Sequence, residues 1–448
     1  MNCDLSLKGL PGDKSISHRA LLISSLSARP VLLNGVNLGG AVLPLVKGLM
    51  KLGVRIERAG PDALSVCGGL FHSNPATRLY MGPSSAAARL LIGLLAGTGT
   101  AAIVDGNAVL RARPMDFVVE PLNSLGADIR YLGEAGRLPV AIEKGAFRGG
   151  RARMRVASAQ AVSALLLAAF GANRAVEIET VAHARDHTER LLVEMGMEIR
   201  RQDRLVIAEP SGKQLPAADA LPAVWSIPAD PSTLAYPAAL AALRGRFGSV
   251  SADGVGINPT RIGFFEVLKQ VTGAELCVQT EGLVLGEPVG RVVVNGNSVQ
   301  PEPVSLSGKS LVHSMIDEVP LLVAVMGLTG VGGRLTDCEE LVFKETNRLD
   351  STARMLRTFG LDVETSNDGF RLGKFKPVAT GRTEPLVVPS FGDHRIAMTT
   401  VVVANSLRVP VLVEDGRCYL TSAPGFPALM RQLRVPVKVE GSHLQVGR

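Results

Sequence analysis

The chain repeats one pattern of polar and apolar positions six times. In each repeat, a short cluster of small or polar residues precedes an apolar run with helical spacing, and a second amphipathic run ends just before a strand-like segment. Successive clusters lie roughly 70–85 residues apart, far longer than solenoid repeats. The clusters begin at Pro11, Gly82, Ala157, Pro228, Ile316 and Gly392. Because the bare N–H groups of a helix N-terminus attract anions, six such starts favour a highly charged substrate.

Each repeat reads as a helix, a strand, a second helix and two further strands. In the first repeat we predict helices over 15–27 and 43–52, a strand over 31–36, and a hairpin-like pair over 54–58 and 63–66. Such a unit cannot bury both faces of its sheet alone. The fold class is therefore α/β, with the repeats packed together as sheets covered by helices.

Five of the second helices are followed by a glycine where a helix end needs a positive φ. These glycines are Gly53, Gly126, Gly196, Gly273 and Gly360. The sixth repeat has Arg434 there, so we expect its helix to end differently. The stretch 298–315, with prolines and serines, is expected to be a long mobile loop.

Composition and length place the chain among ordinary globular proteins of two or more domains. It has 448 residues, 46% of them hydrophobic and 20% charged. No apolar run approaches the ~20 residues of a membrane-spanning helix, and the first residues do not resemble a signal peptide. The five cysteines show no CxxC spacing, which fits reduced thiols and a cytoplasmic location.

The net charge of +7 favours anionic partners. Lysines and arginines are dispersed along the chain, and aromatic residues make up only 4%, so base-stacking platforms for nucleic acid are poorly supplied. We therefore expect small anionic ligands, with neither nucleic acid nor membrane as a partner.

Basic residues accompany several helix starts. Lys14 and Arg19 are about one turn apart after Gly12, although the spacing is not that of a P-loop and a solvated helix start is the alternative. Lys344 and Arg348 are spaced to share one helix face. Arg395 opens a helix against the usual dipole preference, which suggests an anion there.

Three other polar residues each allow a functional and a purely structural interpretation. Arg113 precedes a proline that can occupy a first helical position, but a plain surface arginine is the alternative. His187 is a possible catalytic residue, whereas Asp186 and Glu189 around it are spaced as a capping pattern. Asp317 precedes an apolar run, where a carboxylate can be a simple helix cap.

Eight motifs in order give the chain a family resemblance. They are 11–20 (PGDKSISHRA), 113–115 (RPM), 158–160 (SAQ), 185–189 (RDHTE), 258–261 (NPTR), 316–320 (IDEVP), 344–349 (KETNRL) and 392–398 (GDHRIAM). In this order they resemble the 5-enolpyruvylshikimate-3-phosphate synthase (EPSP synthase) family along essentially the whole chain.

The resemblance implies a two-lobed enolpyruvyl-transferase-like fold with six βαβαββ units, three per lobe, and an active site in the cleft between the lobes. A proline-rich break at 222–230 is where we place the crossover. The lobes are then residues 13–228, and residues 1–12 together with 229–448. We expect a monomer.

The resemblance also implies the reaction and its residues. An alcohol adds to carbon 2 of phosphoenolpyruvate, and phosphate then leaves; phosphoenolpyruvate is a co-substrate, and no metal or other cofactor is implied. Such chemistry needs a base, an acid and cations. By motif position Asp317 resembles the base, Glu345 the group that handles the carbon-3 proton, and Lys14 a catalytic cation. Residues resembling substrate binders are Ser15, Arg19, Arg113, Ser158, Gln160, Arg185, Lys344, Arg348 and Arg395.

Several positions depart from the family pattern. They are Ala41, Pro83, Ser85, Ala184, Asn347 and Pro424. Because polar groups are lost around the acceptor, the favoured hypothesis is a paralogue acting on another phosphorylated alcohol, such as the 3′-hydroxyl of UMP in nucleoside-antibiotic biosynthesis. A shikimate-pathway EPSP synthase acting on shikimate 3-phosphate is nearly as well supported, and a non-catalytic anion-binding paralogue is the third alternative.

Overall fold

The structure is a computed structural model that describes residues 5–210, 222–244, 249–296, 302–330, 332–373 and 384–447. The chain divides into two compact units. Unit 1 comprises Met1–Pro11, Ala229–Gly282 and Pro288–Arg448, and unit 2 comprises Gly12–Pro228 with Leu283–Glu287. We expected the chain to pass from one lobe to the other after residues 12 and 228, and both positions lie within one residue of these boundaries. The assignment of 283–287 to unit 2 was not expected.

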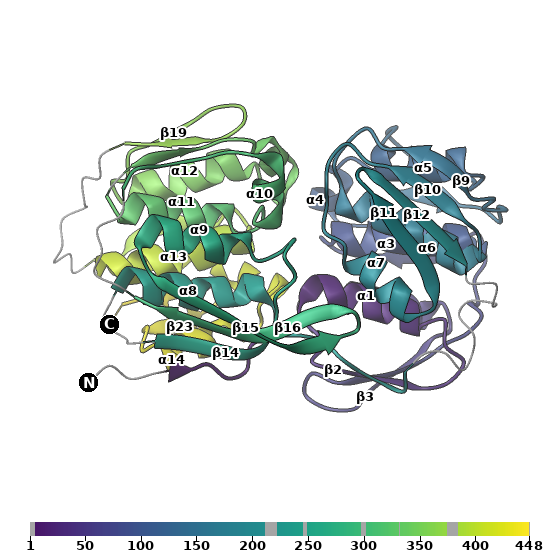
Figure 1. Ribbon diagram of the computed structural model, residues 1–448, viewed down its shortest axis with the longest axis horizontal. Helices are drawn as coiled ribbons and strands as arrows, with labels where there is room; N and C mark the ends of the chain where they lie inside the picture. Colours follow the sequence, from purple (N-terminus) through teal and green to yellow (C-terminus); the bar gives the residue numbers. More distant parts are fainter. Residues whose placement is uncertain are drawn as a thin grey trace. The chain divides into compact units, whose positions relative to one another are not determined.

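Within the described residues the strands form six four-stranded sheets, one for each repeat (Figure 1). In each sheet an edge strand pairs in parallel with one central strand, as β9 does with β10. That central strand pairs antiparallel with the other central strand, as β10 does with β12, and the other central strand pairs with the second edge strand, here β11. The βαβαββ expectation is confirmed in every repeat, with the α/β class of the fold.

Unit 2 holds the first three repeats. The first contains α1 (Lys14–Ser24), β2 (Val31–Asn34), α2 (Leu43–Lys51), β3 (Arg55–Arg58), β4 (Leu64–Cys67) and, from far along the chain, β13 (Val224–Ser226). The second contains β5 (Arg78–Tyr80), α3 (Ser85–Thr98), β6 (Ala102–Asp105), α4 (Ala108–Arg111), α5 (Asp116–Ser124), β7 (Ile129–Tyr131) and β8 (Val140–Ile142). The third contains β9 (Gly150–Arg153), α6 (Ala159–Ala172), β10 (Val176–Glu179), α7 (His187–Glu194), β11 (Met197–Gln202) and β12 (Leu205–Pro210).

Unit 1 holds the other three repeats. The fourth contains β1 (Leu5–Ser6), α8 (Pro231–Arg244), β14 (Ser249–Gly256), α9 (Gly263–Thr272), β15 (Glu275–Val284) and β16 (Glu287–Asn295). The fifth contains β17 (Val304–Leu306), α10 (Lys309–Ser314), α11 (Val319–Leu328), β18 (Gly333–Leu335), the 3₁₀ helix η1 (Glu339–Phe343), α12 (Arg348–Thr358), β19 (Val363–Thr365) and β20 (Phe370–Leu372). The sixth contains β21 (Leu386–Pro389), α13 (His394–Leu407), β22 (Val411–Glu414), the 3₁₀ helix η2 (Gly416–Thr421), α14 (Phe426–Gln432), β23 (Val437–Glu440) and β24 (His443–Val446).

Each unit has its own hydrophobic core around helices that are buried on nearly every side. In unit 2 these are α3 and α6, and in unit 1 they include α11 and α13. The strands bury alternate residues against these helices, as Val31 and Leu33 do in β2. A helix that is apolar all round is stable only in such an interior position.

The α3–α6 contact is a contact of backbones. A Cβ atom added at Gly93 would lie 2.2 Å from the carbonyl oxygen of Ala164, and one added at Gly97 would lie 2.2 Å from that of Ala168. Only glycine fits at such a distance. Both pairs have the same sequence offset of 71 residues (164 − 93 and 168 − 97), so the two helices lie alongside each other in constant register.

The helix ends follow the prediction in five repeats and correct it in the sixth. Gly53, Gly126, Gly196, Gly273 and Gly360 all have positive φ. The expectation that the sixth helix ends differently is wrong, because Arg434 adopts φ 54° and makes the same left-handed turn after α14. An arginine in this conformation is strained relative to glycine, by an energy of about 1 kcal/mol.

The prediction of a mobile loop over 298–315 is also wrong for its described part, because β17 and α10 lie within it. Residues 298–301 lie outside the described residues.

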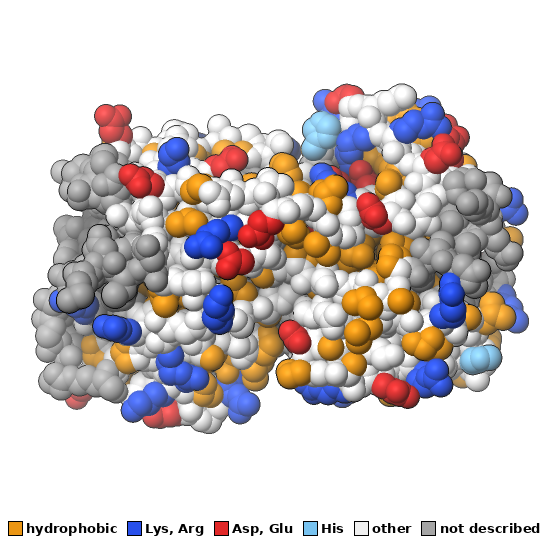
Figure 2. Space-filling model, turned by 60° about the horizontal axis from the view of Figure 1, so that its bottom comes forward, with side chains coloured by type: hydrophobic (Ala, Val, Ile, Leu, Met, Phe, Trp, Pro, Cys, Tyr) orange, Lys and Arg blue, Asp and Glu red, His pale blue; other side chains and the backbone are white. Residues whose placement is uncertain are grey.

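Figure 2 shows lysines and arginines scattered singly over the visible face, in agreement with their dispersal along the sequence. Among the described helices, none combines the length and the apolar character needed to cross a membrane.

We predict that Gly93→Ala lowers the free energy of unfolding by about 3 kcal/mol, because the added methyl group forces the α3 and α6 backbones apart. Urea unfolding followed by circular dichroism measures the change. Gly48→Ala in α2 is the matched control: its Cβ meets only the mobile end of Met81, at 2.7 Å, so we expect a change within about 1 kcal/mol. Equal effects of the two substitutions would contradict the tight α3–α6 contact.

Candidate functional site

Three helices of unit 2 begin at capped N-termini that the sequence predicted as anion-binding starts. Asp13 caps α1 through Ile16 N–H at 2.9 Å, Ser84 caps α3 through Ala87 N–H at 3.2 Å, and Ser158 caps α6 through Ala161 N–H at 3.3 Å. Ser158 accepts in its cap, so its hydroxyl hydrogen remains a donor. Each helix start carries a partial positive charge that favours an anion.

His18 connects the starts of α1 and α3. Its Nδ1 lies 2.7 Å from the Lys14 carbonyl oxygen, and its Nε2 lies 3.0 Å from the Ala41 carbonyl and 3.2 Å from the Ser84 hydroxyl. Burial lowers the pKa of His18 to about 4, against the Ala41 hydrogen bond, which raises it. The ring is therefore neutral at pH 7 and carries one N–H, so it can donate to only one of the Lys14 and Ala41 carbonyls at a time.

Two residues of α3, Ser85 and Arg89, form hydrogen bonds with Arg113 and Gln160 respectively. Arg113 NH1 donates to the Ser85 hydroxyl at 3.0 Å. One turn farther along α3, Arg89 donates through NH1 to Gln160 Oε1 and through NH2 to the Pro114 carbonyl, each at 2.7 Å. Ser85, which replaces a family glycine, thus has a defined partner.

Arg19 joins three helices of unit 2. Its Nε donates to Thr188 Oγ1 at 2.7 Å, its NH1 to the Ser15 carbonyl at 2.8 Å, and its NH2 to Ser163 Oγ at 2.8 Å. The guanidinium is only 3% exposed. Ser15 and Lys14 lie at the half-buried start of α1, and Arg185 is half-buried just before α7.

His187 lies in a buried ion-pair geometry rather than in a helix cap. Its Nδ1 is 2.7 Å from Glu287 Oε1, and both side chains are almost fully buried. The capping pattern predicted here is wrong, since Asp186 makes no capping hydrogen bond and accepts from Arg190 Nε at 2.8 Å instead. Glu189 pairs with Arg201.

In unit 1, Asp317 is surrounded by cationic side chains. Its carboxylate lies 3.5 Å from Arg348 NH1, 3.8 Å from Arg261 NH1 and 3.9 Å from Lys344 Nζ. The alternative of a simple helix cap is wrong for this segment, because Glu318 is the N-cap residue of α11 and makes no capping hydrogen bond. Asp317 remains one quarter exposed.

Arg348 is buried in a cluster of carboxylates. Its Nε and NH2 donate to the two oxygens of Asp393 at 2.8 and 3.2 Å, and NH2 also donates to Glu345. Burial by itself lowers the pKa of Arg348, but Asp393 and Glu345 outweigh burial and raise it. No described group accepts a hydrogen bond from NH1. A bound anion would supply that acceptor.

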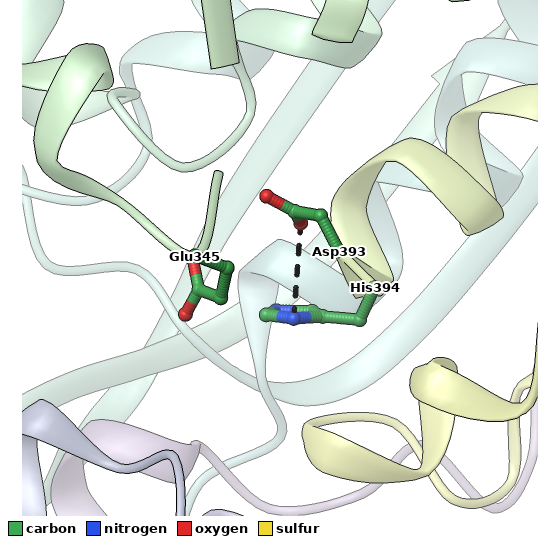
Figure 3. Close-up of side chains that lie close together, drawn as sticks. All are labelled: Glu345, Asp393 and His394. Carbon is green, nitrogen blue, oxygen red and sulfur yellow. Dashed lines mark ion pairs between the residues drawn. The ribbon is translucent and has the colours of Figure 1, made fainter. Parts of the chain in front are cut away.

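Glu345, Asp393 and His394 bring possible metal ligands within 4.8 Å of one another (Figure 3). His394 Nδ1 is 4.0 Å from Asp393 Oδ1. Because Arg348 donates to both carboxylates, a guanidinium already provides the positive charge in this cluster. This grouping could not be predicted from the sequence, since residues 345 and 393 come from separate repeats.

Arg395 occupies a second buried cationic position of unit 1. Its NH1 is 3.3 Å from Glu318 Oε1, and its Nε meets no acceptor among the described residues. Burial opposes its charge, but the Tyr236 phenol and Glu318 raise the pKa of Arg395. Burial raises the pKa of Tyr236 to about 12, so the phenol keeps its proton.

Lys344 and Arg348 do not share a helix face, contrary to the prediction. Lys344 follows η1, and α12 begins only at Arg348, after the N-cap Asn347. Asn347 accepts from Leu349 N–H at 3.1 Å, and asparagine caps as well as aspartate, so this departure from the family preserves the local structure. Both cations nevertheless approach Asp317.

Glu340 holds Lys344, with Nζ 2.8 Å from Oε1. His313 Nε2 lies 3.6 Å from the other Glu340 oxygen. Burial raises the pKa of Glu340, but Lys344 outweighs burial and the pKa is lowered. The ammonium of Lys344 is therefore already compensated by a carboxylate.

Pro114 lies two positions earlier than the first helical position expected for it, and Pro83 takes the corresponding place before α3. Pro83 and Pro114 precede the N-cap residues Ser84 and Met115, so neither occupies the first helical position. Each helix still begins directly afterwards, because a proline is also compatible with the extended residue before a cap.

The structure thus gathers the predicted residues in two sets. Unit 2 carries Lys14, Ser15, Arg19, Arg113, Ser158, Gln160 and Arg185, and unit 1 carries Asp317, Lys344, Glu345, Arg348 and Arg395. No role was predicted for four further residues, Arg89, Asp230, Arg261 and Glu340. Arg261 NH2 lies 3.4 Å from Asp230 and 2.9 Å from Ser232, which anchors it beside Asp317. Its place in the 258–261 motif was the available signal.

Comparison with known sequences gives matches along almost the whole chain. A profile of the family described as EPSP synthase (3-phosphoshikimate 1-carboxyvinyltransferase) matches residues 7–430. A 3-phosphoshikimate 1-carboxyvinyltransferase of Acidiphilium cryptum is 35% identical over 442 residues, 96% of this chain and 94% of the relative. That of Chloroflexus aurantiacus is 36% identical over 423 residues, 93% of this chain and 94% of the relative.

Two solved structures are also similar. The EPSP synthase of Acinetobacter baumannii has a TM-score of 0.78 and 30% identity, covering 96% of this chain and 97% of that one. The enolpyruvyl transferase NikO of Streptomyces tendae has a TM-score of 0.74 and 14% identity, covering 98% and 97%. At that identity the likeness to NikO concerns the fold alone.

We predict that His18 makes the protein less stable as the pH falls from about 6.5 towards 4. In the unfolded chain the imidazole binds its proton near the ordinary histidine pKa of 6.5, whereas in the folded protein it does so only near 4, so acid favours unfolding. The loss should approach about 3 kcal/mol at the acid end. Urea unfolding at several pH values measures it.

The control for this pH dependence is His18→Gln, which lacks the titrating ring and should flatten the acid limb of the stability profile. His183→Gln, at an exposed histidine, should leave that limb unchanged. An unaltered profile in His18→Gln would contradict the buried neutral ring.

Proposed function

Because the chain belongs to the EPSP synthase family and is an enolpyruvyl transferase, we propose that its acceptor is shikimate 3-phosphate. The observation that carries this proposal is the identity of 35–36% to relatives named 3-phosphoshikimate 1-carboxyvinyltransferase, over more than nine tenths of both chains. The protein would then transfer the enolpyruvyl group of phosphoenolpyruvate to a hydroxyl of shikimate 3-phosphate and release phosphate.

The cations of both units suit the charge of phosphoenolpyruvate. Arg348 and Arg395 are planar forks whose remaining donors suit its carboxylate. Lys14, Arg113 and Gln160 add donors from unit 2.

The proposed chemistry assigns two carboxylates. The hydroxyl oxygen of the acceptor bonds to carbon 2 of phosphoenolpyruvate while Asp317 takes the hydroxyl proton. At the same time, a proton from Glu345 goes to carbon 3. In the second step, carbon 3 gives a proton back to Glu345 and the carbon–oxygen bond to phosphate breaks, which restores the double bond. The leaving phosphate takes the proton that Asp317 had accepted. Lys14 and the arginines stabilise the negative charge of the phosphate that leaves. These steps use no cofactor besides the co-substrate.

UMP remains the second candidate acceptor, and the departures around the acceptor side favour it. Ala184 provides no hydroxyl, and Pro83 replaces an amide side chain. The 2.8 Å contact with Glu340 also compensates Lys344, a residue expected at the acceptor. An acceptor that relied on Lys344 for its phosphate would have to compete with that carboxylate.

The acceptor is tested by phosphate release. We expect release when the protein is incubated with phosphoenolpyruvate and shikimate 3-phosphate, and none above background with UMP. The product is identified by mass spectrometry as the acceptor plus a carboxyvinyl group. Release with UMP alone would overturn the shikimate proposal and establish the other acceptor.

We predict that Asp317→Ala lowers kcat by about 10²–10⁴-fold, because the acceptor hydroxyl loses its base. The KM for phosphoenolpyruvate should stay within about twofold, since Arg348 retains Asp393 and Glu345 as partners. Asp253→Ala, which removes an exposed carboxylate paired with Arg291, is the control and should leave both constants unchanged. Turnover retained in Asp317→Ala would remove this residue as the base.

A further inference from the structure

One face of α3 carries the residues that hold the ligand-binding side chains of unit 2. Ser85 and Arg89 are four residues apart and therefore lie on the same side of the helix. Gln160 follows Arg89 by 71 residues (160 − 89), the same offset as in the Gly93–Ala164 and Gly97–Ala168 contacts. The close packing of α3 on α6 thus places Arg89 opposite Gln160.

Arg89 is held on three sides in this position. Its two terminal nitrogens donate to Gln160 Oε1 and to the Pro114 carbonyl, each at 2.7 Å. Its guanidinium carbon lies 4.6 Å from the centre of the Phe117 ring, a favourable cation–π distance. With 8% exposure, the side chain is close to fully buried.

These contacts determine which end of the Gln160 carboxamide is exposed. A guanidinium has donors only, so the amide oxygen must face Arg89; the opposite orientation would place two donors against each other. The NH₂ group of Gln160 then points away from Arg89. Gln160 is itself partly exposed near the start of α6, where its NH₂ adds a donor to the positive helix end.

We propose that Arg89 is a positioning residue that orients the Gln160 carboxamide so that its NH₂ group donates to phosphoenolpyruvate. This inference rests on the proposed function, in which Gln160 binds that co-substrate. The hydrogen bond of the same guanidinium to the Pro114 carbonyl keeps Arg89 in place beside Gln160. Arg89 thus acts on the anion through Gln160, without contacting it.

The test is a double-mutant cycle on the full-length protein. Arg89→Gln and Gln160→Ala should each raise the KM for phosphoenolpyruvate by about tenfold, the loss of roughly one oriented hydrogen bond. The KM for the acceptor should change less than about twofold. If Arg89 acts through Gln160, adding Arg89→Gln to Gln160→Ala should change the KM by less than about twofold more.

Two further variants distinguish orientation from general stability. Gln160→Glu retains an oxygen for Arg89 but has no NH₂ donor, so it should remain as stable as the wild type to urea while losing phosphoenolpyruvate affinity at least tenfold. Arg89→Lys keeps the charge without the two-pronged geometry and should restore affinity only in part. Arg354→Gln is the matched control, because Arg354 also lies 4.6 Å from a phenyl ring, that of Phe391, at an exposed site of unit 1.

Binding of phosphoenolpyruvate, measured by calorimetry, repeats the comparison without turnover and so does not depend on the acceptor. If Gln160→Ala leaves the affinity unchanged, the assignment of Gln160 in the proposed function fails. If Gln160→Ala weakens binding but the Arg89→Gln effect is fully additive or absent, the proposed function stands and the positioning role of Arg89 is overturned.

Discussion

The contact of the α3 and α6 backbones determines the geometry of unit 2. Gly93 and Gly97 allow the two helices to approach until a methyl group would collide with a carbonyl oxygen. The same register brings Arg89 to Gln160 at 2.7 Å. Donors for a ligand are thus located by core packing, which deforms little, rather than by loops, and their positions should be accurate before any ligand binds.

In unit 1, the site residues are located by buried ion pairs, in contrast to the close helix packing of unit 2. Arg348 and Asp393 are both almost fully buried, and isolated charges in such a position would be very costly. Each is compensated by a partner of opposite sign at hydrogen-bond distance. Asp317 lies at the edge of this network, next to three cations from two separate segments. Its charge therefore contributes to the folded state as well as to the proposed reaction.

Local patterns predicted the repeats and their α/β units well, because helix starts, glycine turns and alternation act over a few residues. The predictions failed where tertiary contacts decide. Arg434 takes the left-handed turn although a different helix end was expected there, and Lys344 lies outside the helix that its spacing predicted. Arg89 and Glu340 showed no signal, since their partners come from another repeat or from an irregular turn. The acidic cluster around Arg348 was hidden for the same reason.

The edge strands β1 and β13 complete sheets whose other strands lie far from them along the chain, which affects the order in which the two units can fold. Unit 2 is nearly continuous in sequence, and its first sheet is completed by β13 pairing with β2 at Val224–Leu32. The segment of β1, by contrast, is made before unit 2 and pairs with β14, Leu5 with Val250. On the ribosome, unit 2 can therefore close its core while the N-terminal strand still waits for its partner. The order of synthesis favours the inserted unit as the first folded intermediate, with unit 1 completing its own core only afterwards.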